Sequence, residues 1–189
     1  MALLGITLLS STVHAASLNP TGINFTGGTV NGTSHVADGF IPNEGTQWQT
    51  TTAWWSGTSQ VVTFDYGSLF TIEDILVSVD NNDSYKVQWS ANAGSWTDLF
   101  SISSSYGDIG WGVDTMTSFA GPEYISQIDF SPVQAQFLRI FATGGDNLYS
   151  VGEFQAHGIQ ASAVPLPATV WLFAPALMGL IGFRRTKKS

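Results

Sequence analysis

Hydrophobic and polar side chains alternate in several short segments between residues 61 and 157. Val62, Phe64 and Tyr66 share one face of such a segment, and the apolar residues at 75, 77 and 79 share a face of another. A period of two residues is typical of β-strands with one buried face. The same pattern predicts further strands at 85–90, 125–130, 136–142 and 151–157. No segment of this region has the 3.6-residue period of a helix, so the pattern indicates an all-β domain.

Clusters of Gly, Asn, Asp and Pro separate these segments, at 80–83, 121–122 and 144–147. Short strands joined by polar turns at close spacing predict an antiparallel β-sandwich of two sheets, of the jelly-roll type. We place this single domain at residues 17–160, a length that suffices to bury a core. The chain has no cysteine, so its stability must come from that core and not from disulfides.

The N-terminus has the features of a secretory signal peptide, which we place at residues 1–16. An apolar run at Ala2–Leu9 is followed by small residues at Val13 and Ala15, which predict cleavage after Ala15 or Ala16. A secretory signal normally begins with a basic residue, and none precedes Leu9. Two explanations stay open: a start codon farther upstream, or a truncated sequence.

The C-terminus, residues 161–189, combines a small flexible linker with an apolar segment at Thr169–Phe183 and a basic tail at Arg184–Lys188. The apolar segment is close to the roughly 20 residues that a transmembrane helix needs. Basic residues stay on the cytoplasmic side of a membrane, so the sandwich is expected on the other side. The sequence therefore predicts an exported protein with a C-terminal transmembrane helix.

A short motif precedes this helix, and it consists of Val164, Pro165, Leu166, Pro167 and Ala168. Motif, helix and basic tail together resemble the VPLPA variant of the bacterial PEP-CTERM sorting signal. The resemblance implies recognition and cleavage by an exosortase, in bacteria that secrete exopolysaccharide. The protein would cross the inner membrane, be anchored there transiently, and end at the cell surface or in the extracellular matrix. The alternative is a permanent single-span anchor.

The body between the two signals is strongly acidic. All 14 carboxylates of the chain lie there, against Lys86 and Arg139 as its only Lys or Arg residues. Such a charge repels nucleic acid, which proteins bind by neutralising phosphates. It suits a divalent cation, although net charge that simply keeps the protein soluble explains most of these residues equally well.

Several strings within residues 22–158 resemble the discoidin or coagulation-factor-5/8 type C module, which has the galactose-binding-like β-sandwich fold. The strings that carry the resemblance are 36–39, 46–48, 61–67, 80–85, 96–97, 136–140 and 146–154. The stretch Gly107–Phe119 departs from the family pattern as an insertion. The resemblance implies a non-catalytic module that binds carbohydrate through loops at one end.

The same resemblance implies a structural calcium ion held by Asp38, Thr46 and Glu153, with Glu44 as an alternate ligand. These are oxygen donors, which calcium prefers. The alternative is that Asp38 forms an Asx-turn before Gly39 and that Glu153 is a solvated edge residue.

A sugar site needs an aromatic face and polar groups for the hydroxyls. Trp111 is the best candidate for stacking because Gly110 and Gly112 place it in a loop. The other aromatic residues in Gly/Ser/Thr-rich stretches are Trp48, Trp54, Trp55 and Tyr106, and hydrogen bonds are expected from Asp108, Asp114, Asn82 and Asn147. The alternative is that these aromatic residues close the ends of the core.

The sequence offers little for catalysis. After signal removal only His35 and His157 remain, no serine lies in a Gly-x-Ser-x-Gly turn, and zinc lacks ligands. The function predicted best is an exported carbohydrate-binding module of the cell surface or exopolysaccharide matrix. A structural or adhesive matrix protein without glycan binding is the alternative, and a small polysaccharide hydrolase is the third candidate.

Overall fold

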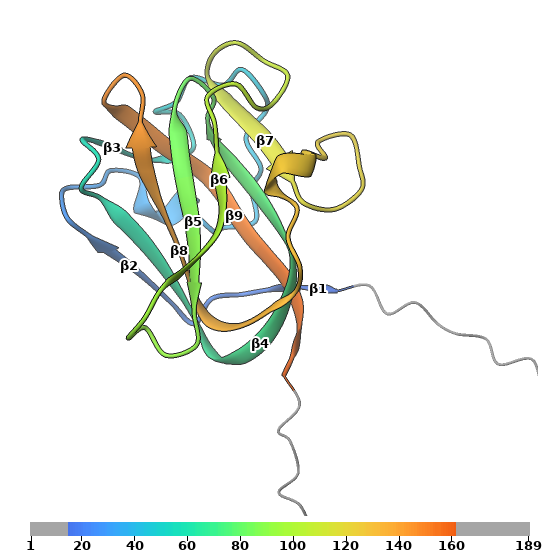
Figure 1. Ribbon diagram of the computed structural model, residues 1–189. Helices are drawn as coiled ribbons and strands as arrows, with labels where there is room; N and C mark the ends of the chain where they lie inside the picture. Colours follow the sequence, from blue (N-terminus) through green and yellow to red (C-terminus); the bar gives the residue numbers. More distant parts are fainter. Residues whose placement is uncertain (1–14, 162–189) are drawn as a thin grey trace, which may run out of the picture.

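The computed structural model describes residues 15–161, and these residues form an antiparallel β structure without an α-helix (Figure 1). The elements are β1 (Ala16–Leu18), β2 (Gly22–Thr26), η1 (Thr33–His35), β3 (Ala53–Ser56), β4 (Val61–Asp80), β5 (Ser84–Ser90), β6 (Thr97–Ile102), β7 (Val113–Thr117), η2 (Ser126–Ile128), β8 (Val133–Gly144) and β9 (Leu148–Gln160). The predicted signal peptide, apart from its last residues, and the predicted sorting motif and transmembrane helix lie outside the described range. Within it, no helix is long and apolar enough to cross a membrane.

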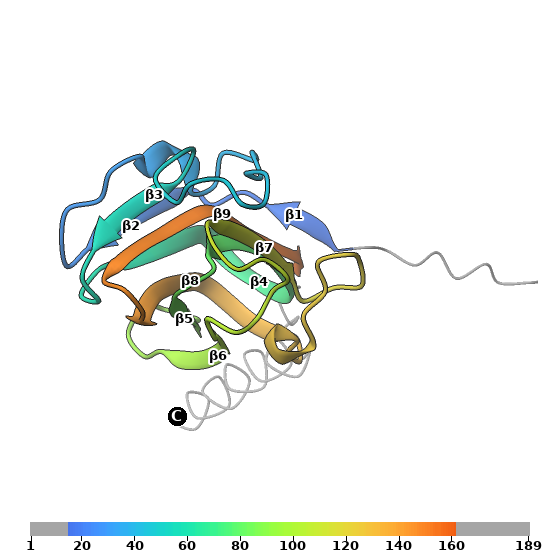
Figure 2. The same cartoon turned by 90° about the horizontal axis from the view of Figure 1, so that it is seen from above.

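Strand β4 links the two layers of the sandwich. Its first part, 61–65, pairs with β2 and β8, whereas its last part pairs with β9 and β7. The register shifts between Asp65 and Phe70, where Gly67 has a positive φ of 74° and the strand bends. β9 also pairs with β1 and β3, and β8 pairs with β5, which pairs with β6. Figure 2 shows β9 and β8 on opposite sides of β4.

The core lies between these layers and is rich in aromatic side chains. Phe64 of β4 and Phe154 of β9 stack with their ring centroids 4.5 Å apart. Tyr85 of β5 meets Tyr149 of β9 edge to face at 6.1 Å, and Trp55 packs against the other side of Tyr149. All five side chains are buried. The antiparallel sandwich that the sequence predicts is therefore confirmed.

Some predicted elements differ from the structure. Residues 61–66 and 75–79 were expected in separate strands, but both belong to the continuous β4. The predicted strand at 125–130 is wrong, because Ser126–Ile128 forms a 3-10 turn in which only Ile128 is buried. The pattern did not indicate β2, β3, β6 or β7. β7 is buried at every position although Asp114, Thr115 and Thr117 are polar, so polarity and exposure do not alternate along it.

Candidate functional site

Three connections meet at one end of the sandwich: the β4–β5 turn, the β6–β7 loop and the β8–β9 turn, at the top of Figure 1. The main-chain N–H of Asn81 donates to the carbonyl of Gly112 at 2.9 Å. The main-chain N–H of Asp146 donates to Asp83 Oδ1, and the Asn82 amide donates to Asp146 Oδ2, both at 3.1 Å. These bonds join all three connections. We call this surface the loop end.

Five of the residues predicted to bind glycan lie at the loop end. Trp111, Tyr106 and Asp108 belong to the β6–β7 loop, Asn82 to the β4–β5 turn, and Asn147 to the β8–β9 turn. The side chains of Asn82, Asp108 and Asn147 are exposed, and Tyr106 packs partly against the core. The structure thus brings residues from distant parts of the sequence to one surface. Glycan binding there stays a prediction.

Trp111 is 66% exposed, more than any other large hydrophobic side chain among residues 15–161. Gly112 permits this placement, because its φ is 76° and a Cβ there would lie 2.6 Å from the carbonyl oxygen of Thr46. The side-chain amide of Asn81, in the β4–β5 turn, donates to the carbonyl of Ile109 and so anchors the loop that precedes Trp111. Trp111 is therefore a solvent-facing aromatic residue on a loop that is fixed at both sides.

The remaining tryptophans of the sequence prediction are less exposed than Trp111. Trp55 is buried in β3, and Trp48 and Trp54 pack edge to face at 5.3 Å while half-buried. For Trp55 the alternative interpretation, that aromatic side chains close the core, agrees with the structure, whereas Trp48 and Trp54 are not among the described side chains that pack against the core. Of these four tryptophans, Trp111 has the most exposed side chain.

The loop end carries buried acidic groups. Burial raises the pKa of Asp80 to about 7, and repulsion from Asp83 and Asp146 adds to the effect. Burial likewise raises the pKa of Asp83 to about 6, although the Asp146 main-chain N–H and the Tyr85 hydroxyl partly offset it. Both side chains are almost fully buried. The pKa values of both carboxyl groups therefore lie close to neutral pH.

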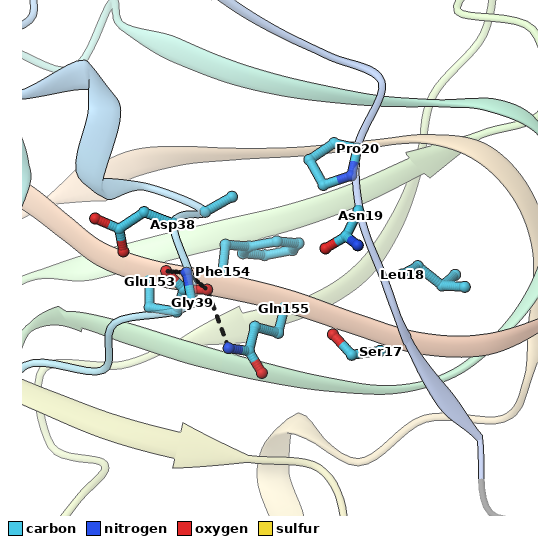
Figure 3. Close-up of a pocket in the computed structure, with 10 residues that line it drawn as sticks. Ser17, Leu18, Asn19, Pro20, Asp38, Gly39, Glu153, Phe154 and Gln155 are labelled. Atoms are coloured by element: carbon cyan, nitrogen blue, oxygen red, sulfur yellow. Dashed lines mark hydrogen bonds between the residues drawn. The ribbon is translucent and has the colours of Figure 1, made fainter.

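A second candidate lies beside β1, where Asp38 and Glu153 line a hollow of about 120 Å³ (Figure 3). Both Glu153 carboxylate oxygens accept from the main-chain N–H of Gly39, at 3.2 and 3.3 Å, and Gln155 donates to Oε1 at 3.1 Å. Burial raises the pKa of Glu153. Because Glu153 is 1% exposed, it is not the solvated edge residue of the alternative interpretation.

Asp38 does form the Asx-turn of that interpretation, because its Oδ1 accepts from the Phe40 N–H at 2.9 Å. Its Oδ2 lies 3.2 Å from His35 Nδ1. Thr46, the third expected calcium ligand, does not line the hollow; its main chain pairs with Val113 of β7. The structure thus joins two of the three expected ligands.

Glu44, the alternate ligand, belongs to a different group of carboxylates. It gathers with Asp108, Asp114 and Glu123, and one carboxylate oxygen from each lies within 4.8 Å of the others. Sequence reasoning proposed Asp108 and Asp114 only as sugar ligands and did not single out Glu123. Nothing in the sequence pattern indicated that these four residues meet, since they come from three loops and a strand.

Comparison with family models and with curated proteins gives no match. Among solved structures, truncated AlyQ with CBM32 and alginate lyase domains is 18% identical, with a TM-score of 0.55 over 83% of this chain; the chain spans 37% of that protein. The CBM32 of AlyQ in complex with 4,5-unsaturated mannuronic acid is 17% identical, with a TM-score of 0.51 over 75% of this chain and 97% of that one.

CBM32-1 from a family 31 glycoside hydrolase of Clostridium perfringens is 14% identical, with a TM-score of 0.50 over 73% of this chain and 95% of that one. The identities are low, so these matches speak to the backbone arrangement only. They agree with the galactose-binding-like fold expected from the sequence. Residues 15–161 therefore have the β-sandwich fold of CBM32 domains.

Proposed function

We propose that this chain is a non-catalytic carbohydrate-binding protein whose glycan site is the loop end, with Trp111 as the stacking platform. The observation that carries the proposal is the 66% exposure of Trp111 on an anchored loop. An exposed aromatic ring on a rigid support stacks on the apolar face of a sugar at little entropic cost. The fold supports the proposal, because its structural neighbours include sugar-binding modules.

The exposed polar groups of the loop end suit sugar hydroxyls. Asp108, Asn82 and Asn147 are exposed and offer both donors and acceptors. Asn82 is oriented by its bond to Asp146, and Asn147 has a positive φ of 78° that fixes the β8–β9 turn. A few oriented polar groups beside one aromatic face are the usual composition of a sugar site.

Export and sorting form a further part of the proposal. The signal peptide at 1–16 and the motif at 164–168 support a route across the inner membrane, followed by exosortase cleavage and release to the cell surface or matrix. This part rests on the sequence alone.

A structural calcium ion beside β1 is also proposed, with Asp38 and Glu153 as ligands. The chemistry fits, because the hollow is lined by oxygen-bearing side chains that include Ser17, Asn19 and Gln155 (Figure 3). Thr46 fits less well, since it does not line the hollow. Calcium there would supply a fixed positive charge for the buried Glu153 carboxylate.

A glycan array tests the glycan site, using the full chain in mild detergent, once with calcium and once with chelator. Trp111→Ala should weaken binding at least about tenfold, which corresponds to about 1.4 kcal/mol, while the melting temperature stays unchanged. Phe40→Ala is the matched control, because Phe40 is also an exposed aromatic residue, at 52%, but lies beside the other hollow.

Two results would overturn the proposal. One is equal glycan binding by the Trp111→Ala variant and the wild type. The other is no binding of any glycan by the wild type under either condition, which would favour the structural or adhesive matrix protein.

A further inference from the structure

Glu44, Asp108, Asp114 and Glu123 form a carboxylate cluster that strand β7 holds together. Asp114 lies on β7 itself. Val113 exchanges main-chain hydrogen bonds with Gly45 and Thr46, at 3.0 and 2.8 Å, which brings Glu44 alongside. The main-chain N–H of Thr117 donates to the carbonyl of Glu123 at 2.7 Å. This bond holds the segment that contains Glu123 against the end of strand β7.

Asp114 is the buried member of the carboxylate cluster. Its side chain is 0% exposed, and neither carboxylate oxygen has a hydrogen-bond partner of good geometry among residues 15–161. The main-chain N–H groups of Asp108 and Thr115 lie near enough to lower its pKa, but burial and repulsion from Glu44 and Asp108 raise it overall. A buried carboxylate without partners is costly, so such a group calls for a compensating charge.

No cationic side chain supplies that charge. In residues 15–161 the Lys and Arg residues are Lys86 and Arg139. Lys86 binds Asp98 at 2.8 Å, and Arg139 donates to Gln88 and covers the Trp96 ring. Both pairs lie on β5, β6 and β8, so the four carboxylates face one another without a protein counter-charge.

A fifth oxygen lies close to the carboxylate cluster. Asn81 is 5% exposed, and its Oδ1 also has no hydrogen-bond partner in the described part of the chain. A Cβ on Gly107 would lie 1.8 Å from Asp114 Oδ2 and 3.3 Å from Asn81 Oδ1, so both oxygens border the same point of the β6–β7 loop. Three unpartnered buried oxygens, two of Asp114 and one of Asn81, lie beside three further carboxylates and form an oxygen-rich site.

We propose that the carboxylate cluster binds a calcium ion, which ties the segment of Glu44, the β6–β7 loop and the segment of Glu123 to strand β7. Calcium binds oxygen at 2.3–2.6 Å, so ligand atoms on opposite sides of the ion are about 4.6–5.2 Å apart. The four carboxylate oxygens lie within 4.8 Å of one another, which suits calcium. Magnesium usually keeps several waters and binds one or two protein carboxylates, so a group of four favours calcium.

This calcium site differs in its ligands from the proposed one at Asp38 and Glu153, and it does not depend on glycan binding. Its consequence concerns the loop that carries Trp111, because Asp108 and Trp111 lie on the same loop. This chain has no disulfides, so a cation bound by three loop segments would cross-link them as a disulfide does elsewhere.

Isothermal titration calorimetry tests the proposal, with chelator-treated full chain in mild detergent and CaCl2 up to about 10 mM, a range that covers weak extracellular calcium sites. Asp114→Asn and Glu44→Gln should each abolish one binding event or weaken it at least about tenfold. Glu73→Gln is the control carboxylate variant and should bind as the wild type. Glu153→Gln should leave this event intact, which separates it from the site beside β1.

Thermal unfolding distinguishes a cation site from a purely structural role of Asp114. Without calcium, Asp114→Asn should melt at a higher temperature than the wild type, because it removes a buried charge that lacks partners. With calcium, the wild type should gain more stability than Asp114→Asn, which keeps only the site beside β1. The proposal would be overturned if calcium failed to bind the wild type, or if the Asp114→Asn and Glu44→Gln variants bound it with wild-type affinity.

Discussion

The carboxylate of Asp114 lies directly against the main chain of Gly107, so closely that a Cβ on Gly107 would be 1.8 Å from Asp114 Oδ2. Gly107 also has a φ of 79°, in the left-handed region that side chains disfavour. The carboxylate therefore leaves no room for a side chain at position 107, on the loop that also carries Asp108 and Trp111.

Replacement of Gly107 by alanine should therefore destabilise the domain. The left-handed conformation alone costs about 1–2 kcal/mol for a residue with a Cβ, and the displacement of Asp114 adds to it. Gly110→Ala is the control from the same loop, because nothing lies within 4 Å of its Cβ position. Urea unfolding measures both variants, and equal midpoints for Gly107→Ala and Gly110→Ala would show that the contact is unimportant.

Tyr85 connects the loop end to the core. Its hydroxyl accepts from the main-chain N–H of Ser150 at 3.2 Å and reaches Asp83 Oδ2 at 3.5 Å. Tyr85→Phe leaves a buried N–H of β9 without its partner, so we expect a loss of about 1–3 kcal/mol in the free energy of unfolding. Tyr124→Phe is the control, because it removes an exposed hydroxyl that donates to Asp129 at 3.0 Å. This variant should change the free energy of unfolding by less than about 0.5 kcal/mol.

The alternation of apolar residues predicted much of the core. Val62, Phe64, Ile75, Val77 and Val79 are all completely buried, as their shared faces indicated. The pattern failed where both faces of a strand are covered, as in β7, and where a short apolar segment supports a single turn, as at Ser126–Ile128. The pattern also did not indicate that β4 is continuous. Glycine is typical of strand ends, but Gly67 lies within β4 where the strand bends.

The candidate sites were predictable only in part. Glycines on both sides of Trp111 indicated its loop position, and the exposure of its ring agrees with that. Thr46 was expected beside Asp38, but its main chain pairs with β7 instead. The approach of Glu123 to Glu44 depends on how the segment after β7 returns to it, which is a tertiary contact with no local signal.

Asp80 should make the stability of the domain depend on pH. Its pKa is raised from 3.8 to about 7 in the folded state, so between about pH 4 and pH 7 the folded state holds a proton that the unfolded chain has lost. Stability therefore falls as the pH rises through this window. The stabilising contribution of the protonated group is complete below about pH 4 and lost above about pH 7.

Asp80→Asn should remove this contribution to the pH dependence and raise the free energy of unfolding above pH 7 by about 1–3 kcal/mol, while leaving it nearly unchanged at pH 4. Unfolding curves between pH 4 and pH 8 give the comparison. Asp98→Asn is a suitable control, because this exposed carboxylate has its pKa lowered by Gln88 and Lys86. Parallel profiles for wild type and Asp80→Asn would mean that Asp80 is ionised throughout this range.

The charge of the loop end should determine which glycans bind there. Asp108 is exposed on the loop that carries Trp111, and the exposed Asp146 accepts a hydrogen bond from Asn82. Within residues 15–161, neither Lys86 nor Arg139 contacts these two carboxylates. Uronic acids would be repelled, so neutral or amino sugars should bind more tightly at low ionic strength.

Calorimetry with neutral, amino-sugar and uronic-acid oligosaccharides of equal length measures this preference at two salt concentrations. Added salt should strengthen uronic-acid binding, weaken amino-sugar binding and leave the neutral sugar unaffected, because salt screens repulsion and attraction alike. With chelator present, so that calcium does not bind Asp108, Asp108→Asn should reduce all charge-dependent differences by removing one carboxylate from the loop end. Tighter binding of the uronic acid at low salt would show that the acidic groups do not face the sugar.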